Sequence, residues 1–292
     1  MHLATLSPAR FSLFTLIALG LVLSTVSGQV HTWQPMGGPP VGIPSALATH
    51  PATGAIAIAP VSGGVYLDVN GTSWRYTGEG LSDLYVTDLS SDGVGGWYAA
   101  TRDTGVLHYS ATTGTWTSVA PGLPESRIEA VFTTKSGRVL AAPRKDFLHS
   151  WRVGTSQWEY TGVGYPLLGY DESAAHASFM QEENGRLWAA TTYGILTSTD
   201  DGDIWDEKHN GLANLSFEGG ITKTSTGMLI AGHTFLGPYR STNNGDSWAP
   251  MDTVGRPRHV RAVASDLHGN VLIAAEEGLY GSTDGGNSFS RL

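Results

Sequence analysis

Short apolar runs bounded by glycine recur along the chain. They come about every 42 residues, and most end in a pair of small residues. Runs this short do not form helices, and glycines on either side are typical of turns, so we expect strands buried on both faces. The six runs are 54–59, 96–101, 137–142, 185–191, 227–232 and 269–275.

An aromatic residue recurs with a similar period and is expected to open the last strand of each unit. Its positions are Trp33, Trp74, Trp116, Trp158, Trp205, Trp248 and Phe289, separated by 41, 42, 42, 47, 43 and 41 residues. A period of this length is typical of β-propeller blades. The third strands are expected at 64–67, 105–109, 147–150, 194–197, 238–240 and 278–280.

The turn before the aromatic residue has a motif of its own in the last three units. It reads Ser-x-Asp/Asn-x-Gly-x-x-aromatic. The Ser and Asp or Asn side chains can bond nearby backbone N–H groups, and the Gly accepts a positive φ. The structural turn residues are Ser198, Asp200, Gly202, Trp205, Ser241, Asn243, Gly245, Trp248, Ser282, Asp284, Gly286 and Phe289.

These turns resemble the Asp-box, or BNR, repeat of sialidase-like β-propellers, and residues 122–142 also resemble the repeat of two-component-regulator propellers. The resemblance implies an all-β fold, a single propeller of four-stranded antiparallel blades, with the turns away from the ligand face. Six blades are favoured, because a closed ring removes exposed strand edges. Seven blades are the alternative, because the strand around Trp33 has no inner strands of its own.

Composition narrows the classes of partner. Only 15% of the residues are charged and the net charge is −9, which argues against nucleic-acid binding. The chain has no cysteine, so disulfides and thiolate metal sites are excluded. The spacing of Asp200, Asp201 and Asp203 does not match an EF-hand loop. We therefore expect no metal and no cofactor.

The N-terminus has the pattern of a secretory signal. Arg10 precedes a mostly apolar run over 11–23, and small residues follow up to Gly28. We expect a signal peptide at 1–28 and a β-propeller domain at 29–292, which is secreted, periplasmic or on the cell surface. A membrane anchor is the alternative, although the run is shorter than a bilayer span. After cleavage we expect a monomer that is not held in a membrane.

The ligand face should be formed by the loops that enter each inner strand and those that join the second and third strands. The longest of these loops, 161–176, accounts for most of the extra residues in the 47-residue interval. Glu172 and His176 are among its polar residues. In the same layer we expect His209, Phe217 and His233. The ligand-binding candidates, which suit a carbohydrate or protein ligand, are Tyr165, Tyr170, Asp171, Tyr193, Glu218 and Phe235. Packing of the loop on the blade tops is the alternative.

The sequence favours an exported, non-enzymatic propeller that acts as a binding or scaffold module. A glycoside hydrolase of the sialidase-like or xyloglucanase-like kind is one alternative, and it would need two carboxylates about 5–10 Å apart. The acids that could supply them are Asp103, Asp146, Asp171, Glu218, Glu276 and Glu277. The arginine set of sialidases is not matched, since Arg256, Arg258 and Arg261 share one loop, so no catalytic residue is assigned. An assembly-factor-like propeller is a further alternative.

Overall fold

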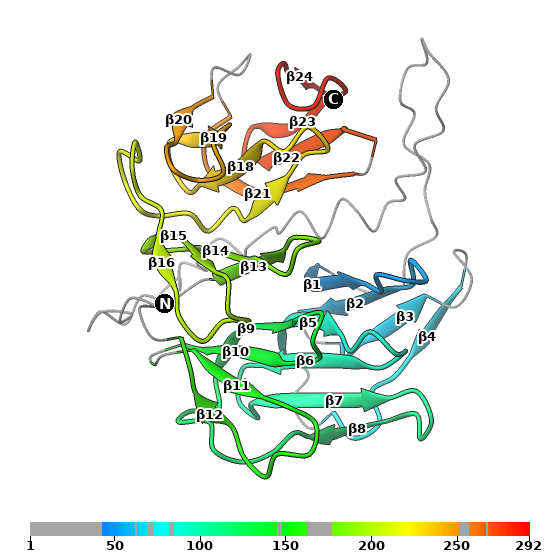
Figure 1. Ribbon diagram of the computed structural model, residues 1–292. Helices are drawn as coiled ribbons and strands as arrows, with labels where there is room; N and C mark the ends of the chain where they lie inside the picture. The colour runs from blue at the N-terminus through cyan, green and yellow to red at the C-terminus, as the bar shows by residue number, and fades with distance from the viewer. Residues whose placement is uncertain are drawn as a thin grey trace, which may run out of the picture.

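The computed structural model describes residues 43–61, 63–68, 73–81, 85–144, 146, 148–162, 177–251, 257–266 and 268–292. Over these ranges the regular elements are β-strands, grouped in six four-stranded antiparallel sheets. The sheets are the blades of a six-bladed β-propeller, which confirms the predicted fold (Figure 1). In each blade four consecutive strands pair in chain order, so the first blade is β1–β4 and the sixth is β21–β24.

The innermost strands lie toward the middle of the ring and the outermost at its periphery (Figure 1). The innermost strands are β1 (Pro44–Thr49), β5 (Val86–Ser91), β9 (Ile128–Thr133), β13 (Ala177–Gln181), β17 (Ile221–Lys223) and β21 (Val260–Ser265). The second strands are β2 (Ile56–Pro60), β6 (Trp97–Thr101), β10 (Val139–Pro143), β14 (Leu187–Thr191), β18 (Leu229–His233) and β22 (Val271–Ala275). They match the apolar runs of the sequence.

The third and fourth strands complete each blade. The third strands are β3 (Tyr66–Asp68), β7 (Val106–Ser110), β11 (His149–Trp151), β15 (Gly194–Ser198), β19 (Gly237–Ser241) and β23 (Gly278–Ser282). The outer strands are β4 (Trp74–Tyr76), β8 (Thr115–Ser118), β12 (Glu159–Tyr160), β16 (Asp206–Glu207), β20 (Ala249–Pro250) and β24 (Ser290–Arg291). In the last four blades the repeated aromatic stands one residue before the outer strand instead of opening it, because strand pairing begins only at the following residue.

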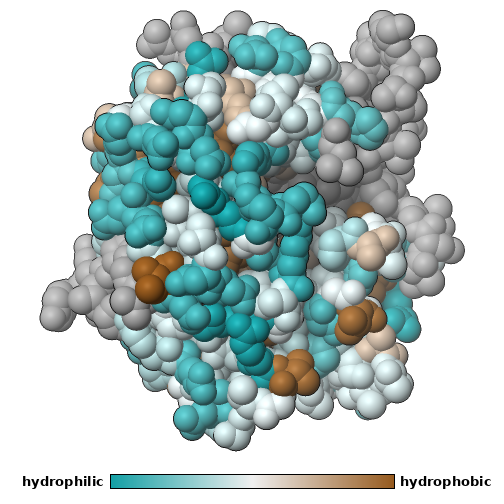
Figure 2. All heavy atoms as spheres, in the orientation of Figure 1, coloured by the Kyte–Doolittle hydropathy of each residue, from teal (hydrophilic) through white to brown (hydrophobic). Residues whose placement is uncertain are grey.

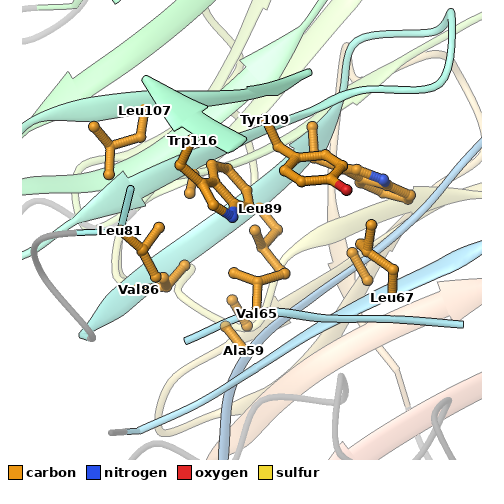
Figure 3. Packing of buried hydrophobic residues seen from close by; sticks show 13 residues of the cluster. Ala59, Val65, Leu67, Leu81, Val86, Leu89, Leu107, Tyr109 and Trp116 are labelled. Carbon is orange, nitrogen blue, oxygen red and sulfur yellow. The ribbon is translucent and has the colours of Figure 1, made fainter. Parts of the chain in front are cut away.

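The hydrophobic core lies between the blades. Each of five clusters joins two consecutive blades and contains the repeated aromatic of the later one. Figure 3 shows the first cluster, where Trp116 and Tyr109 pack with Leu89, Val65 and Leu67. Trp116 also donates its indole N–H to the Thr77 carbonyl of the preceding blade. The repeated aromatics therefore hold neighbouring blades together.

Because the strands alternate in direction, the connections fall at two ends of the ring. One end, here called the turn face, carries the turns between first and second strands and those between third and fourth strands. The other end, the loop face, carries the connections into the inner strands and those between second and third strands. Trp33 lies outside the described residues. The part of the chain that the structure describes contains no helix long and apolar enough to cross a membrane.

Candidate functional site

A central cavity of about 460 Å³ runs between the inner strands of all six blades. Side chains and backbone of every inner strand contribute to its wall, together with Glu218 and Thr234 from the loop face. Its volume lies within the range of small-molecule sites, about 300–1,000 Å³. The cavity is therefore large enough to hold a small ligand or one end of a larger one.

Four inner strands carry a β-bulge at the same place, next to the loop face. In each, the pairing with the second strand skips one residue near the start of the inner strand. The skipped residues, here called the mouth residues, are Ser45, Thr87, Glu129 and Arg261. All four line the cavity. Bulges re-aim side chains and are common beside functional sites, so the fold directs four polar groups to one end of the cavity.

The two charged mouth residues are both ion-paired. The Arg127 Nε donates to Glu129 Oε1 at 2.8 Å, and the Glu129 side chain is only 2% exposed. The Arg261 guanidinium lies 3.4 Å from Glu276 Oε1. Glu129 belongs to the third blade and Arg261 to the sixth, which are opposite one another in a ring of six. The mouth therefore has an ion pair on each side.

The two uncharged mouth residues are held by hydrogen bonds to neighbouring backbone. The Ser45 hydroxyl donates to the Ala59 carbonyl at 2.9 Å within its own blade. The Thr87 hydroxyl donates to the Ile128 carbonyl of the next blade at 2.5 Å. Each hydroxyl oxygen can still accept a hydrogen bond from a ligand. These bonds fix the rotamers of the mouth side chains.

Asp88 follows the bulge of β5 and lies further inside the cavity. Its Oδ2 accepts the Val131 N–H of the third blade at 3.0 Å, and its Oδ1 accepts the Leu89 N–H at 2.8 Å. Burial raises the pKa of Asp88 to about 7, although the two N–H donors act in the opposite direction. The carboxyl group is therefore both a link between two blades and a group that titrates near neutral pH.

The structure describes three of the six predicted ligand-binding residues, and all three lie at the loop face. Glu218 lines the cavity, and its N–H lies 3.4 Å from the Thr234 hydroxyl. Phe235 is 54% exposed and its neighbour Leu236 is 51% exposed, and both lie in the turn between β18 and β19. Tyr193 is half-buried in the turn between β14 and β15. Tyr165, Tyr170 and Asp171, with the rest of 163–176, lie outside the described residues.

Two residues expected in the ligand layer are instead buried. Phe217 and His233 have no exposed surface, and their rings meet edge to face at 5.0 Å. The His233 Nδ1 accepts the N–H groups of Phe235 and Leu236 at 2.9 and 3.0 Å, and burial lowers the pKa of His233. The imidazole thus shapes the turn that presents Phe235, which explains why it lies inside.

The candidate acids of the hydrolase alternative are engaged in local contacts where the structure describes them. Glu276 pairs with Arg261, and the Glu277 carboxylate accepts the Arg258 N–H at 3.1 Å. Both lie in the turn between β22 and β23. Over the described ranges, no group of three or more His, Asp or Glu side chains is arranged to hold a metal ion.

The turn face has the predicted locks. In the turn that precedes Trp205, the Ser198 hydroxyl accepts the Gly202 N–H at 2.9 Å and the Asp200 carboxylate accepts the Ile204 N–H at 3.0 Å. Gly202 has a φ of 92°, as predicted, and Asp201 before it is also left-handed, at 62°. The other two turns repeat these bonds.

At the turn face, hydrogen bonds also join the turns of neighbouring blades. Arg138 of the third blade donates to Asp203 and to the Asp201 carbonyl of the fourth blade. The Arg138 guanidinium lowers the pKa of Asp203. These polar side chains bind to the protein itself, and they do not line the cavity.

Sequence reasoning did not assign the mouth residues or Asp88 to the site. A partial signal was present, because the second residue of the inner strand is polar in all six blades, and the four mouth residues are among these. Ser45, Thr87 and Glu129 are spaced by 42 residues, the period of the repeat. In a regular strand, successive side chains alternate between the two faces of the sheet. Each mouth residue would then face a neighbouring blade, and the bulge directs it toward the axis instead.

The surface in Figure 2 is mostly hydrophilic, and apolar residues form small separate patches. The face drawn in Figure 2 therefore shows no broad apolar surface among the coloured residues.

No protein-family model matches the chain, and no curated protein matches it. Among solved structures, virginiamycin B lyase from Staphylococcus aureus is similar, with a TM-score of 0.65 and 13% identity over 85% of this chain and 83% of that one. YCF48 bound to D1 peptide has a TM-score of 0.62 and 14% identity, covering 85% of this chain and 81% of its own.

The extracellular domain of a hybrid two component system from B. thetaiotaomicron is also similar. Its TM-score is 0.60 at 15% identity, over 86% of this chain and 34% of that one. The chain thus spans about a third of the length of such domains. At these identities the likeness shows the fold alone, a β-propeller that is shared by proteins with different activities.

Proposed function

We propose that the chain is an exported, non-enzymatic propeller that binds a carbohydrate or protein ligand at its loop face. The observation that carries this proposal is the set of four bulges, which direct Ser45, Thr87, Glu129 and Arg261 into one end of the central cavity. Bulges of this kind are common beside functional sites, which supports a ligand site at this end of the cavity.

The similar structures support a binding role. Several of them are extracellular or surface domains, and YCF48 was solved with a bound peptide. The bonds of the Ser-x-Asp turns support the Asp-box interpretation of the repeat, which we infer here from the turns themselves. We extend the ligand site to Tyr165, Tyr170 and Asp171 of the loop 161–176, by their place in the sequence.

Binding tests this proposal directly. The mature protein is screened on a neutral-glycan array and on a displayed peptide library, and hits are repeated with Arg261→Gln and Phe235→Ala. Arg152→Gln is the matched control, because Arg152 forms an ion pair with Asp201 on the turn face at 2.9 Å. We expect both loop-face variants to weaken binding and the control to retain it. Turnover of a glycoside by the parent protein, lost in a double variant of Asp171 and Glu218, would contradict the non-enzymatic part.

Export has its own test. We infer that the signal peptide ends at Gly28 and that the mature protein starts at Gln29. N-terminal sequencing of the exported protein should return Gln29. Recovery of the intact chain, starting at Met1, in the membrane fraction would overturn this inference.

A further inference from the structure

We propose that the cavity mouth binds a neutral polyhydroxylated group, such as the end of a saccharide, rather than a charged ligand or a polypeptide segment. This inference rests on the proposed function and names the ligand class of the same site. It is carried by the charge balance of the mouth, by its hydroxyl groups and by the shape of the cavity.

The charges at the mouth are compensated within the protein. Glu129 has Arg127 as its partner at 2.8 Å, and Arg261 has Glu276 at 3.4 Å. An anionic or cationic ligand would have to compete with these pairs, which lowers the gain from binding it. A neutral ligand can instead bond to the pairs without separating them. The guanidinium of Arg261 has five N–H donors, so the contact with Glu276 leaves donors for ligand oxygens.

Two further acids line the cavity and can supply polar contacts to a neutral ligand. Asp88 has a pKa near 7 because of burial, so it is partly protonated at neutral pH and can then donate as well as accept. Glu218 adds a carboxylate acceptor on the fifth blade. Asp88 belongs to the second blade and Glu218 to the fifth, so the two acids line the cavity from different blades.

Hydroxyl groups supply the remaining polar lining near the mouth. Ser45, Thr87, Ser178 and Thr234 all contribute to the cavity wall, and they come from four different blades. A ligand rich in hydroxyls both donates and accepts, and so do these side chains. A polypeptide would instead present a row of fixed amide groups, for which an extended groove or sheet edge is the usual partner.

The shape of the cavity favours a short group that enters along the axis. Inner strands of all six blades line it, so a ligand group that reaches its interior enters from one end of the ring. Thr234 lines the cavity, and the next residue, Phe235, is exposed. The Phe235 ring meets the edge of the His259 ring at 5.5 Å, which fixes its position. An aromatic ring held beside a polar site offers an apolar platform for one face of a sugar.

Calorimetry with defined probes tests the inference. The mature protein is titrated with neutral disaccharides, with a uronic acid, with an amino sugar and with a neutral peptide. Two variants are compared with the parent: Arg261→Gln removes the guanidinium, and Ser178→Phe fills the cavity. Arg152→Gln on the turn face is again the control, and circular dichroism checks that each variant is folded.

We expect a neutral disaccharide to bind, to bind about tenfold more weakly to Arg261→Gln, and not to bind to folded Ser178→Phe. Arg152→Gln should bind like the parent. If Ser178→Phe does not fold, Arg261→Gln alone decides.

Three results would overturn the inference. The first is saccharide binding that Arg261→Gln leaves unchanged, and the second is tighter binding of the uronic acid or amino sugar. The third is peptide binding without saccharide binding, which would leave the proposed function standing. Absence of any ligand, on the array and the peptide library alike, would overturn both proposals.

Discussion

At the turn face, the Ser198 and Asp200 side chains bond to the backbone of their own turn, whereas at the cavity mouth Glu129 and Arg261 leave their sheets to face a common space. Both ends depend on polar side chains beside irregular backbone. At the turn face the irregular backbone satisfies its own polar groups. At the mouth it disrupts a strand ladder and directs side chains into the cavity.

This difference separates stability from binding. Side chains that complete their bonds within the chain should affect the free energy of unfolding and leave ligand affinity unchanged. Side chains that line the cavity should affect ligand affinity, and one that also bonds between blades, such as Asp88, should affect stability as well. The following predictions test that separation, beginning with the largest expected effect.

Replacement of Trp205 should cost the most stability. Its ring is 2% exposed and fills the cluster between the third and fourth blades, next to the turn that Ser198 and Asp200 lock. Trp205→Ala should lower the free energy of unfolding by about 3–5 kcal/mol, as for other buried aromatics. Urea denaturation measures this. A variant that keeps its stability but loses ligand binding would place the function at the turn face.

Asp88 should give the protein a pH-dependent stability. Its pKa is raised from 3.8 to about 7 in the folded state, so the folded protein binds the proton more tightly than the unfolded chain. The contribution of Asp88 to the free energy of unfolding is therefore largest below about pH 4, and it decreases as the pH rises toward 7.

Asp88→Asn removes this dependence. Between pH 5 and pH 8 the parent should lose about 1–3 kcal/mol more than the variant, since each unit of pKa shift corresponds to about 1.4 kcal/mol and water in the cavity reduces the full effect. Urea denaturation at both pH values measures the difference. Parallel pH profiles for parent and variant would show that the carboxyl group is solvated like a surface acid.

Asp200→Ala should have a smaller effect. The substitution removes the acceptor of the Ile204 N–H, as in the loss of a helix cap, and should cost about 0.5–2 kcal/mol. Asp206→Ala is the control, because Asp206 is an exposed acid just beyond the same turn, in β16. Thermal unfolding of both variants measures the difference. An equal effect of the two substitutions would mean that the lock contributes nothing of its own.

Phe235→Ala should barely change stability, by about 0.5 kcal/mol or less, because more than half of the side chain is already exposed. Its effect on ligand affinity should exceed about 1 kcal/mol, as for an aromatic contact residue. Ile204→Ala is the matched control, since Ile204 is also 54% exposed but lies on the turn face. Equal affinities of the two variants would contradict the assignment of the ligand to the loop face.

The fold could be predicted because the same sequence pattern occurs once in each blade. The second strands, the repeated aromatics and the locked turns each recur with the same period. A strand that is hard to assign in one blade can therefore be assigned from the equivalent strand of another blade. The left-handed φ of Asp201 and Asn244 was not predicted, because a non-glycine residue gives little sign of that conformation.

The site could be predicted only in outline. The loop order predicted that Glu218 and Phe235 lie at the loop face, and both do. It did not show that His233 is buried, because that depends on two N–H groups of its own turn. Nor did it show the mouth residues, because a bulge is set by the pairing of two strands, and either strand alone looks regular.

The bulges also bear on how such a protein could acquire a new specificity. Each mouth residue is the unpaired member of its strand, so its identity is largely independent of the ladder on either side. Ser45, Thr87, Glu129 and Arg261 already show a small hydroxyl, a branched hydroxyl, an acid and a base in equivalent places. A combinatorial library at these four codons would therefore vary the recognition surface on a constant scaffold, in the way that variable loops do on an antibody framework.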